Sequence, residues 1–149
     1  MLISYHYHFI SSVISFWSFN EIPLNELSTL PCKLLFIDGN HENFERLNRL
    51  PRIEKFGAEV GVVRDRCYHL LRGNVYTIEG KTYLAFGGAE SHDKKFRKEG
   101  ISWWKEESIT LADVAKAEKA GKVDFVISHC VPEKVKERMC LDGILPLAY

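Results

Sequence analysis

A short apolar run that ends in a polar tetrapeptide constrains this chain more than any other feature. Leu34-Leu35-Phe36-Ile37 has the length and composition of a buried strand, and Gly39-Asn40-His41-Glu42 follows it directly. A strand of this kind places an amide oxygen and an imidazole at the carboxyl edge of a sheet, where open α/β sheets hold their ligands. The sequence therefore predicts an α/β fold with a candidate site immediately behind this strand.

A second segment has the same layout. The apolar residues 123–128 read as another buried strand, His129 follows it, and Pro132 opens a predicted helix that runs to about Cys140. Taken alone, Asn40 is better explained as a helix N-cap, and His129 as a polar residue with a satisfied hydrogen bond. The shared arrangement of strand, polar group and helix favours a functional interpretation for both residues.

The rest of the sequence predicts one domain, residues 21–149, which follows an aromatic leader over residues 1–20. The leader has no clear period, although residues 5–9 could form a strand. Further elements are predicted from periodicity and turn residues: helices over 24–30, 43–50 and 110–120, strand pieces within 60–71, and a hairpin of 75–78 with 82–86. The helix predicted over 110–120 has an apolar side of Leu111, Val114, Ala115 and Ala117. The hairpin turns at Glu79-Gly80-Lys81, with glycine where a positive φ is needed.

Composition excludes several classes of function. The 149 residues carry 20 basic and 20 acidic side chains, so no net charge favours nucleic acid or an acidic membrane surface. Polar residues interrupt the apolar residues 1–19, and no basic segment precedes them, so neither a membrane span nor a signal peptide is predicted. The four cysteines form no CxxC pair, as expected of reduced thiols in a cytoplasmic protein.

A third stretch makes the functional interpretation of the strand ends at Asn40 and His129 more specific. Gly87-Gly88-Ala89-Glu90-Ser91-His92-Asp93-Lys94 is followed by Arg97 and then by Trp103-Trp104. Together with Gly39-Asn40-His41-Glu42 and the strand that ends at His129, this stretch resembles a bacterial and phage branch of the calcineurin-like metallophosphoesterases. The resemblance covers roughly residues 33–140. It implies a partial metallophosphoesterase-like β-sandwich flanked by helices.

The resemblance also implies roles for individual residues. Asn40 and His129 correspond to ligands of the same metal, and His41 corresponds to the unligated histidine that donates a hydrogen bond or a proton to the reacting phosphate or its leaving group. Glu42 corresponds to the acid of the motif and would orient its neighbours. Lys94 and Arg97 are three residues apart and could face a phosphate together. Their alternative interpretation is a solvated charged loop. His69 reads as structural.

The metal ligands that the family draws from other motifs have no counterpart here. No Asp precedes Asp38 and no His follows His129. The Asp-x-His, Gly-Asp-x-x-Asp and Gly-His-x-His motifs are therefore missing, as if the family domain were truncated at both ends. A two-metal centre of the Mn, Zn or Fe class needs carboxylates to activate its bridging water, and two neutral ligands should bind a metal weakly.

Two functions of different class follow. The first is a metal-dependent phosphoesterase that acts on a phosphate ester and takes its missing ligands from another copy or a complementing chain. The second is a catalytically inactive remnant of the same fold that serves as a phosphate-binding or interaction module. For the isolated chain the missing carboxylates favour the second, whereas phosphoesterase is the better description of descent and reaction class.

Overall fold

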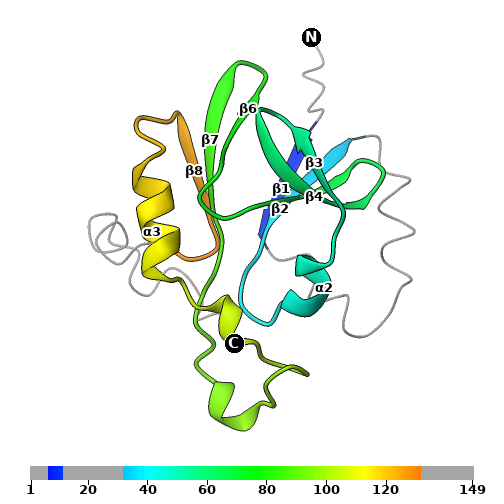
Figure 1. Ribbon diagram of the computed structural model, residues 1–149, viewed down its shortest axis with the longest axis vertical. Coiled ribbons are helices and arrows are strands. Elements are labelled where there is room, and N and C mark those ends of the chain that lie inside the picture. The colour runs from blue at the N-terminus through cyan, green and yellow to red at the C-terminus, as the bar shows by residue number, and fades with distance from the viewer. Residues whose placement is uncertain (1–6, 12–31, 132–149) are drawn as a thin grey trace.

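The computed structural model describes residues 7–11 and 32–131, and Figure 1 shows their arrangement. The protein has a mixed α/β structure, mostly strands in two small mixed sheets with few helices. The elements in chain order are β1 (Tyr7–Ser11), β2 (Lys33–Ile37), α2 (Phe44–Asn48), β3 (Arg52–Lys55), β4 (Ala58–Arg64), β5 (Cys67–Leu70), β6 (Val75–Ile78), β7 (Lys81–Phe86), η2 (Lys94–Phe96), η3 (Lys105–Glu107), α3 (Leu111–Glu118) and β8 (Phe125–Ser128). The predicted helices over 24–30 and from Pro132 to about Cys140 lie outside the described residues.

The larger sheet has five strands in the order β1-β2-β5-β4-β3. β2 is an interior strand and pairs in parallel with both β1 and β5. β4 and β3 then add antiparallel strands, so this sheet is mixed. β1 lies within the segment interpreted as a leader, and β3 lies in a stretch for which no element was predicted. The strand pieces predicted within 60–71 are β4 and β5.

The smaller sheet has the order β6-β7-β8 and confirms the predicted hairpin. Glu79 and Gly80 form the turn with φ values of 50° and 76°, so both turn residues adopt the left-handed conformation. Two-residue turns of this kind match the twist of the strands they join, which explains the tight connection. β8 pairs in parallel with β7 and brings the end of the described chain back to the sheet.

The two sheets share one apolar core. Side chains from one face of the larger sheet pack against side chains from β6 and β7, and the cluster consists of Leu35, Ile37, Val60, Tyr68, Leu70, Tyr76, Ile78 and Ala85. The alternation of strand side chains sends the intervening residues of β2 and β5 to the opposite face. There Leu34, Phe36 and Cys67 pack against Phe44 and Leu47 of α2 and against Trp104. β2 is therefore covered on both faces.

Helix α2 confirms the helix predicted over 43–50. Asn43 is its N-cap, with a side-chain oxygen that accepts a hydrogen bond from the backbone N–H of Arg46 at 3.0 Å. Phe44 and Leu47 are its buried residues. Because α2 begins at Phe44, three residues after His41, its position holds the loop behind β2 against the larger sheet.

Two expectations about burial are wrong. Residues 123–128 were expected to form a buried strand, but Phe125 and Val126 of β8 are 51% and 60% exposed, because β8 lies at the edge of its sheet among the described strands. Helix α3 forms where predicted, with Thr110 and Asp113 as a capping box. Its expected apolar side is not buried: Leu111 is 89% exposed and no residue of the helix is buried. Alternation and helical periodicity predict an apolar face, but they do not determine whether another element covers it.

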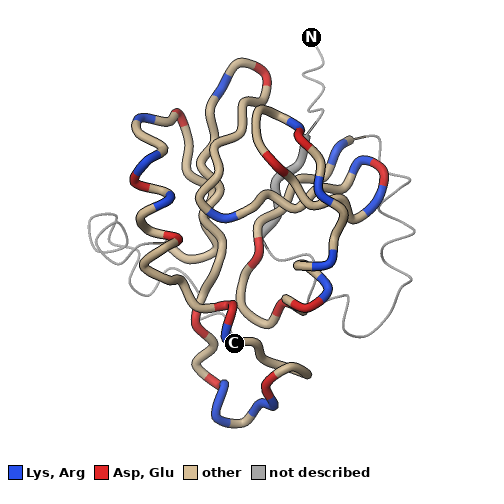
Figure 2. Tube along the Cα trace, in the orientation of Figure 1, with Lys and Arg blue, Asp and Glu red and all other residues tan. Residues whose placement is uncertain are grey.

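Charges of both signs are interleaved over the described surface. Figure 2 shows acidic and basic positions alternating along α3 and along the loop between β7 and α3. This distribution fits the absence of net charge in the sequence. Within the part of the chain that the structure describes, no helix combines the length and apolar composition needed to span a bilayer.

Candidate functional site

The ends of three strands meet at the loop behind β2. The backbone N–H of Gly88, just after β7, donates to the carbonyl oxygen of Asp38, just after β2, at 2.9 Å. A Cβ at Gly87 would lie 2.6 Å from the same carbonyl oxygen, so only glycine permits this approach. His129, just after β8, lies against Gly39, where a Cβ would be 2.5 Å from the imidazole ring. The loops after β2, β7 and β8 therefore form one cluster.

Asn40 and His129, which are 89 residues apart in sequence, are in direct contact. The Nε2 atom of His129 lies 3.0 Å from Oδ1 of Asn40. Burial, partly opposed by the charge of Asp38, lowers the pKa of His129, so its imidazole is neutral near pH 7. Nδ1 of His129 is buried and has no hydrogen-bond partner among the described residues. The site thus contains a neutral imidazole and an amide oxygen side by side.

His41 lies next to this pair in a strained backbone conformation. Its φ is 62°, in the left-handed region that a residue other than glycine rarely adopts. Nδ1 lies 3.1 Å from Oγ of Ser91, and Nε2 lies 3.8 Å from Oδ1 of Asp93. The side chain is 26% exposed, so solvent and small molecules reach one edge of the ring. Glu42, the next residue, is fully buried.

A buried carboxylate, Glu107, holds the loop from the other side. Its two oxygens accept hydrogen bonds from the backbone N–H of Ser91 at 2.7 Å and from Nε1 of Trp103 at 2.7 Å. They also accept from the Ser91 hydroxyl at 2.9 Å and from the backbone N–H of His41 at 3.2 Å. Sequence reasoning gave no role to Ser91 or Glu107. The spacing of Trp103 and Glu107 was visible, but a spacing of four residues has no specific chemical meaning by itself.

Lys94 and Arg97 are both paired with carboxylates of their own loop. Each forms an ion pair with the carboxylate four residues earlier, Lys94 with Glu90 and Arg97 with Asp93 at 2.7 Å. A phosphate would have to displace these carboxylates. Arg97 and Asp93 nevertheless stay close to the site, because the same Asp93 carboxylate lies near the His41 ring.

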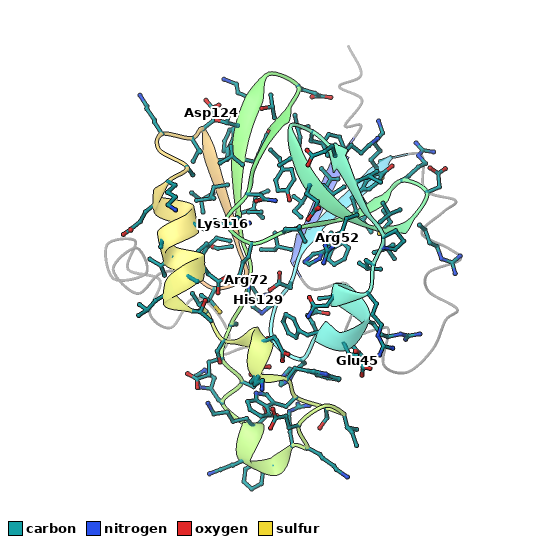
Figure 3. The ribbon with its side chains drawn as sticks, in the orientation of Figure 1. Glu45, Arg52, Arg72, Lys116, Asp124 and His129 are labelled. Atoms are coloured by element: carbon teal, nitrogen blue, oxygen red, sulfur yellow. The ribbon has the colours of Figure 1, made fainter. Side chains whose placement is uncertain are left out.

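Below the loop, Asp38 is part of a buried charged cluster. Its carboxylate accepts from Nε2 of His69 at 3.1 Å and from Nε of Arg72 at 3.0 Å. Burial raises the pKa of Asp38, but the hydrogen bonds and charges of His69 and Arg72 outweigh that effect and leave the pKa below its usual value. Figure 3 labels Arg72 between His129 and Lys116 of α3, whose ammonium group donates to the Arg72 carbonyl oxygen at 3.0 Å.

A pocket of about 290 Å³ lies beside this cluster. Its polar wall includes Asp38, Arg72 and Asp113, and α2 supplies apolar side chains. His69 and Arg52 also line it, and each has one buried nitrogen without a hydrogen-bond partner among the described residues. Asn40, His41 and His129 do not line this pocket.

The described residues do not fit a two-metal centre. Among residues 7–11 and 32–131, no group of three or more His, Cys, Asp or Glu side chains is placed to hold a metal ion. The 3.0 Å separation of Asn40 Oδ1 and His129 Nε2 is about the distance between two adjacent ligands of one divalent ion with bonds of about 2.1 Å. The donor chemistry thus accounts for two neutral positions on a single ion and for no bridging carboxylate.

Comparisons with protein-family models, with curated proteins and with solved structures find no match for this chain.

Proposed function

We propose that this chain is a metallophosphoesterase-type module whose site for a phosphate ester is the loop behind β2. In this proposal Asn40 and His129 are neutral ligands of one divalent ion of the Mn, Zn or Fe class, and His41 is the proton donor. The observation that carries the proposal is the contact of Asn40 with His129 across 89 residues, directly beside His41. Two sheets with a shared core support the corresponding fold, a partial β-sandwich of the metallophosphoesterase type flanked by helices.

The proposal includes a low activity for the isolated chain. Hydrolysis by this family requires carboxylates that bind two metal ions and a bridging water. The described residues offer two neutral donors at this position and no cluster of three ligands. The remaining ligands would have to come from another copy of the chain or from a second polypeptide. Without them, we expect weak metal binding and little or no hydrolysis.

His41 is the residue in this loop that can transfer a proton. Its ring is 26% exposed, and its Nε2 atom faces the carboxylate of Asp93 at 3.8 Å. In its imidazolium form, a histidine can donate a proton to a leaving group. The left-handed φ of His41 also turns the side chain out of the direction that an extended strand would give it.

The second function, an inactive remnant that binds phosphate through Lys94 and Arg97, has less support. Both cations are already paired with carboxylates, so their positive charge is largely compensated before any ligand arrives. An inactive remnant that does not use these two residues remains the alternative, and it predicts no metal binding by Asn40 and His129.

Metal binding separates the two functions. We would add Mn²⁺ to the ¹⁵N-labelled protein and follow the paramagnetic broadening of its side-chain resonances. The proposal predicts that Asn40 and His129 broaden first, and that His129→Ala removes this effect. The exposed His92 provides the matched control, because His92→Ala should leave the broadening unchanged. Broadening that persists in His129→Ala would refute the assigned ligand pair.

The hydrolytic role of His41 has its own test. We would measure Mn²⁺-dependent cleavage of a chromogenic phosphodiester by the unmodified chain and by His41→Ala. A slow cleavage that the substitution reduces by about 100-fold or more is the expected result for a general acid. Cleavage at an equal rate in both proteins would mean that His41 is not the proton donor.

A further inference from the structure

Glu107 and Ser91 lie at the centre of the hydrogen bonds that orient the proposed site residues. Glu107 is fully buried, and Ser91 is 1% exposed. Three N–H groups, from His41, Ser91 and Trp103, point at the two oxygens of Glu107. An N–H group can only donate, so Glu107 is the acceptor in all three of these hydrogen bonds.

This arrangement determines how the Ser91 hydroxyl is used. Its single proton is donated to Oε2 of Glu107 at 2.9 Å, the oxygen that also accepts from the backbone N–H of His41. The lone pairs of Oγ then face two other groups, Nδ2 of Asn40 at 3.4 Å and Nδ1 of His41 at 3.1 Å. Towards both of these groups, Ser91 is an acceptor.

Two consequences follow for the neighbouring residues. Asn40 must present its NH₂ group to Ser91, which turns its amide oxygen toward His129. His41 must carry a proton on Nδ1, so Nε2 is the ring nitrogen that remains available beside Asp93. One buried hydroxyl thus sets both the orientation of an amide and the tautomer of an imidazole.

We propose that Glu107 and Ser91 are positioning residues, which fix the amide of Asn40 and hold His41 as its Nδ1–H tautomer so that proton transfer takes place at Nε2. The functional meaning of this inference rests on the proposed phosphoesterase-type function. The hydrogen-bond arrangement itself does not depend on it. Neither residue touches the reacting groups, so each acts through Asn40 or His41.

The tautomer can be measured without metal, substrate or activity. A long-range ¹H–¹⁵N correlation spectrum at about pH 9, where imidazole rings are neutral, distinguishes a nitrogen that carries a proton from one that does not. The signals of His41 are identified by their loss in His41→Ala. We expect Nδ1 to carry the proton in the unmodified protein, in contrast to a histidine in water, which favours Nε2–H. An Nε2–H tautomer of His41 in the unmodified protein would overturn the proposal.

Two variants test the origin of the tautomer. Ser91→Ala and Glu107→Gln should each shift the His41 population toward the Nε2–H form. The adjacent, exposed Glu106 provides the matched control, and Glu106→Gln should leave the spectrum as in the unmodified protein. An unchanged tautomer in a folded Ser91→Ala variant contradicts the proposal, with folding checked by the amide resonances of the β6–β7 hairpin. If Glu107→Gln does not fold, Ser91→Ala and the unmodified protein still decide the question.

The outcomes also separate this inference from the proposed function. An Nδ1–H tautomer that depends on Ser91, in a protein that shows no Mn²⁺ broadening at Asn40 and His129, supports the positioning role and refutes the metal ligands. Mn²⁺ broadening at those two residues, in a protein whose His41 is the Nε2–H tautomer, supports the metal ligands and refutes the positioning role.

Discussion

Arg72 and Asp38 form a buried ion pair behind β2, with Nε and Nη2 of the guanidinium 3.0 Å and 2.5 Å from the same carboxylate oxygen, Oδ2. The side chains are 12% and 3% exposed.

Removing one partner of such a pair leaves an uncompensated buried charge. We therefore expect Asp38→Asn to lower the free energy of unfolding by about 3 kcal/mol, measured by urea titration. Asp124→Asn, at an exposed carboxylate, is the control and should cost less. Equal losses would contradict the structural role assigned to the pair.

The lowered pKa of Asp38 also predicts how stability depends on pH. Its folded pKa lies below the unfolded value of about 3.9, so the stabilisation is fully present above about pH 5 and is lost as pH falls through the folded pKa. We expect the free energy of unfolding to decrease from pH 5 to about pH 2, and Asp38→Asn to show a shallower decrease. Asp113, whose pKa is also lowered, accounts for part of the remaining slope. Identical slopes in both proteins would show that Asp38 does not contribute.

Gly39→Ala tests the close approach of the loops after β2 and β8. The new Cβ would lie 2.5 Å from Cε1 and Nδ1 of His129, so the imidazole must move away from Asn40. Overpacking of this kind costs about 1–3 kcal/mol of stability. We expect that loss together with large shifts of the His129 ring resonances. In Gly80→Ala, where a Cβ meets nothing within 4 Å, the His129 resonances should stay unchanged. Unperturbed His129 resonances in Gly39→Ala would mean that the two loops do not touch.

The described cysteines should differ in their reactivity. Burial raises the pKa of both thiols, to about 11 for Cys67, but Cys67 is only 2% exposed whereas Cys130 is exposed. Because the thiolate is the reactive form, iodoacetamide should modify Cys130 in the folded protein and leave Cys67 unmodified until the protein unfolds. Peptide mass spectrometry of samples quenched over time measures both sites. Simultaneous modification of Cys67 and Cys130 would contradict this placement of β5.

Tyr76→Phe should destabilise the contact between the two sheets. Tyr76 is fully buried, and its hydroxyl donates to the carbonyl oxygen of Glu59 and accepts from the N–H of Leu71, each at 2.7 Å. The substitution leaves both backbone groups without this partner, which costs about 1–3 kcal/mol. Thermal unfolding measures the change, and Tyr68→Phe on β5 is the control with a smaller expected loss. An unchanged unfolding temperature in Tyr76→Phe would show that water replaces the hydroxyl.

Local sequence determined those parts of the fold that depend on neighbouring residues. The apolar run from Leu34 to Ile37 required a buried strand, and Glu79-Gly80 required a two-residue hairpin turn. Asn43 followed by Phe44 and Leu47 specified the start and the buried side of α2. In each of these cases, the physical cause acts over a few residues: side-chain alternation, positive φ, or a hydrogen bond to the first turn of a helix.

Tertiary structure alone decided which separate segments meet. No local rule places β5 beside β2 or leaves Phe125 and the apolar side of α3 exposed, because pairing and burial depend on which distant elements pack together. Asn40 and His129 could each be selected as the end of a strand, yet their contact across 89 residues exists only because the two sheets share one core. The sequence assigned no role to Ser91 or Glu107. Their importance lies in a hydrogen-bond geometry that only the folded chain creates.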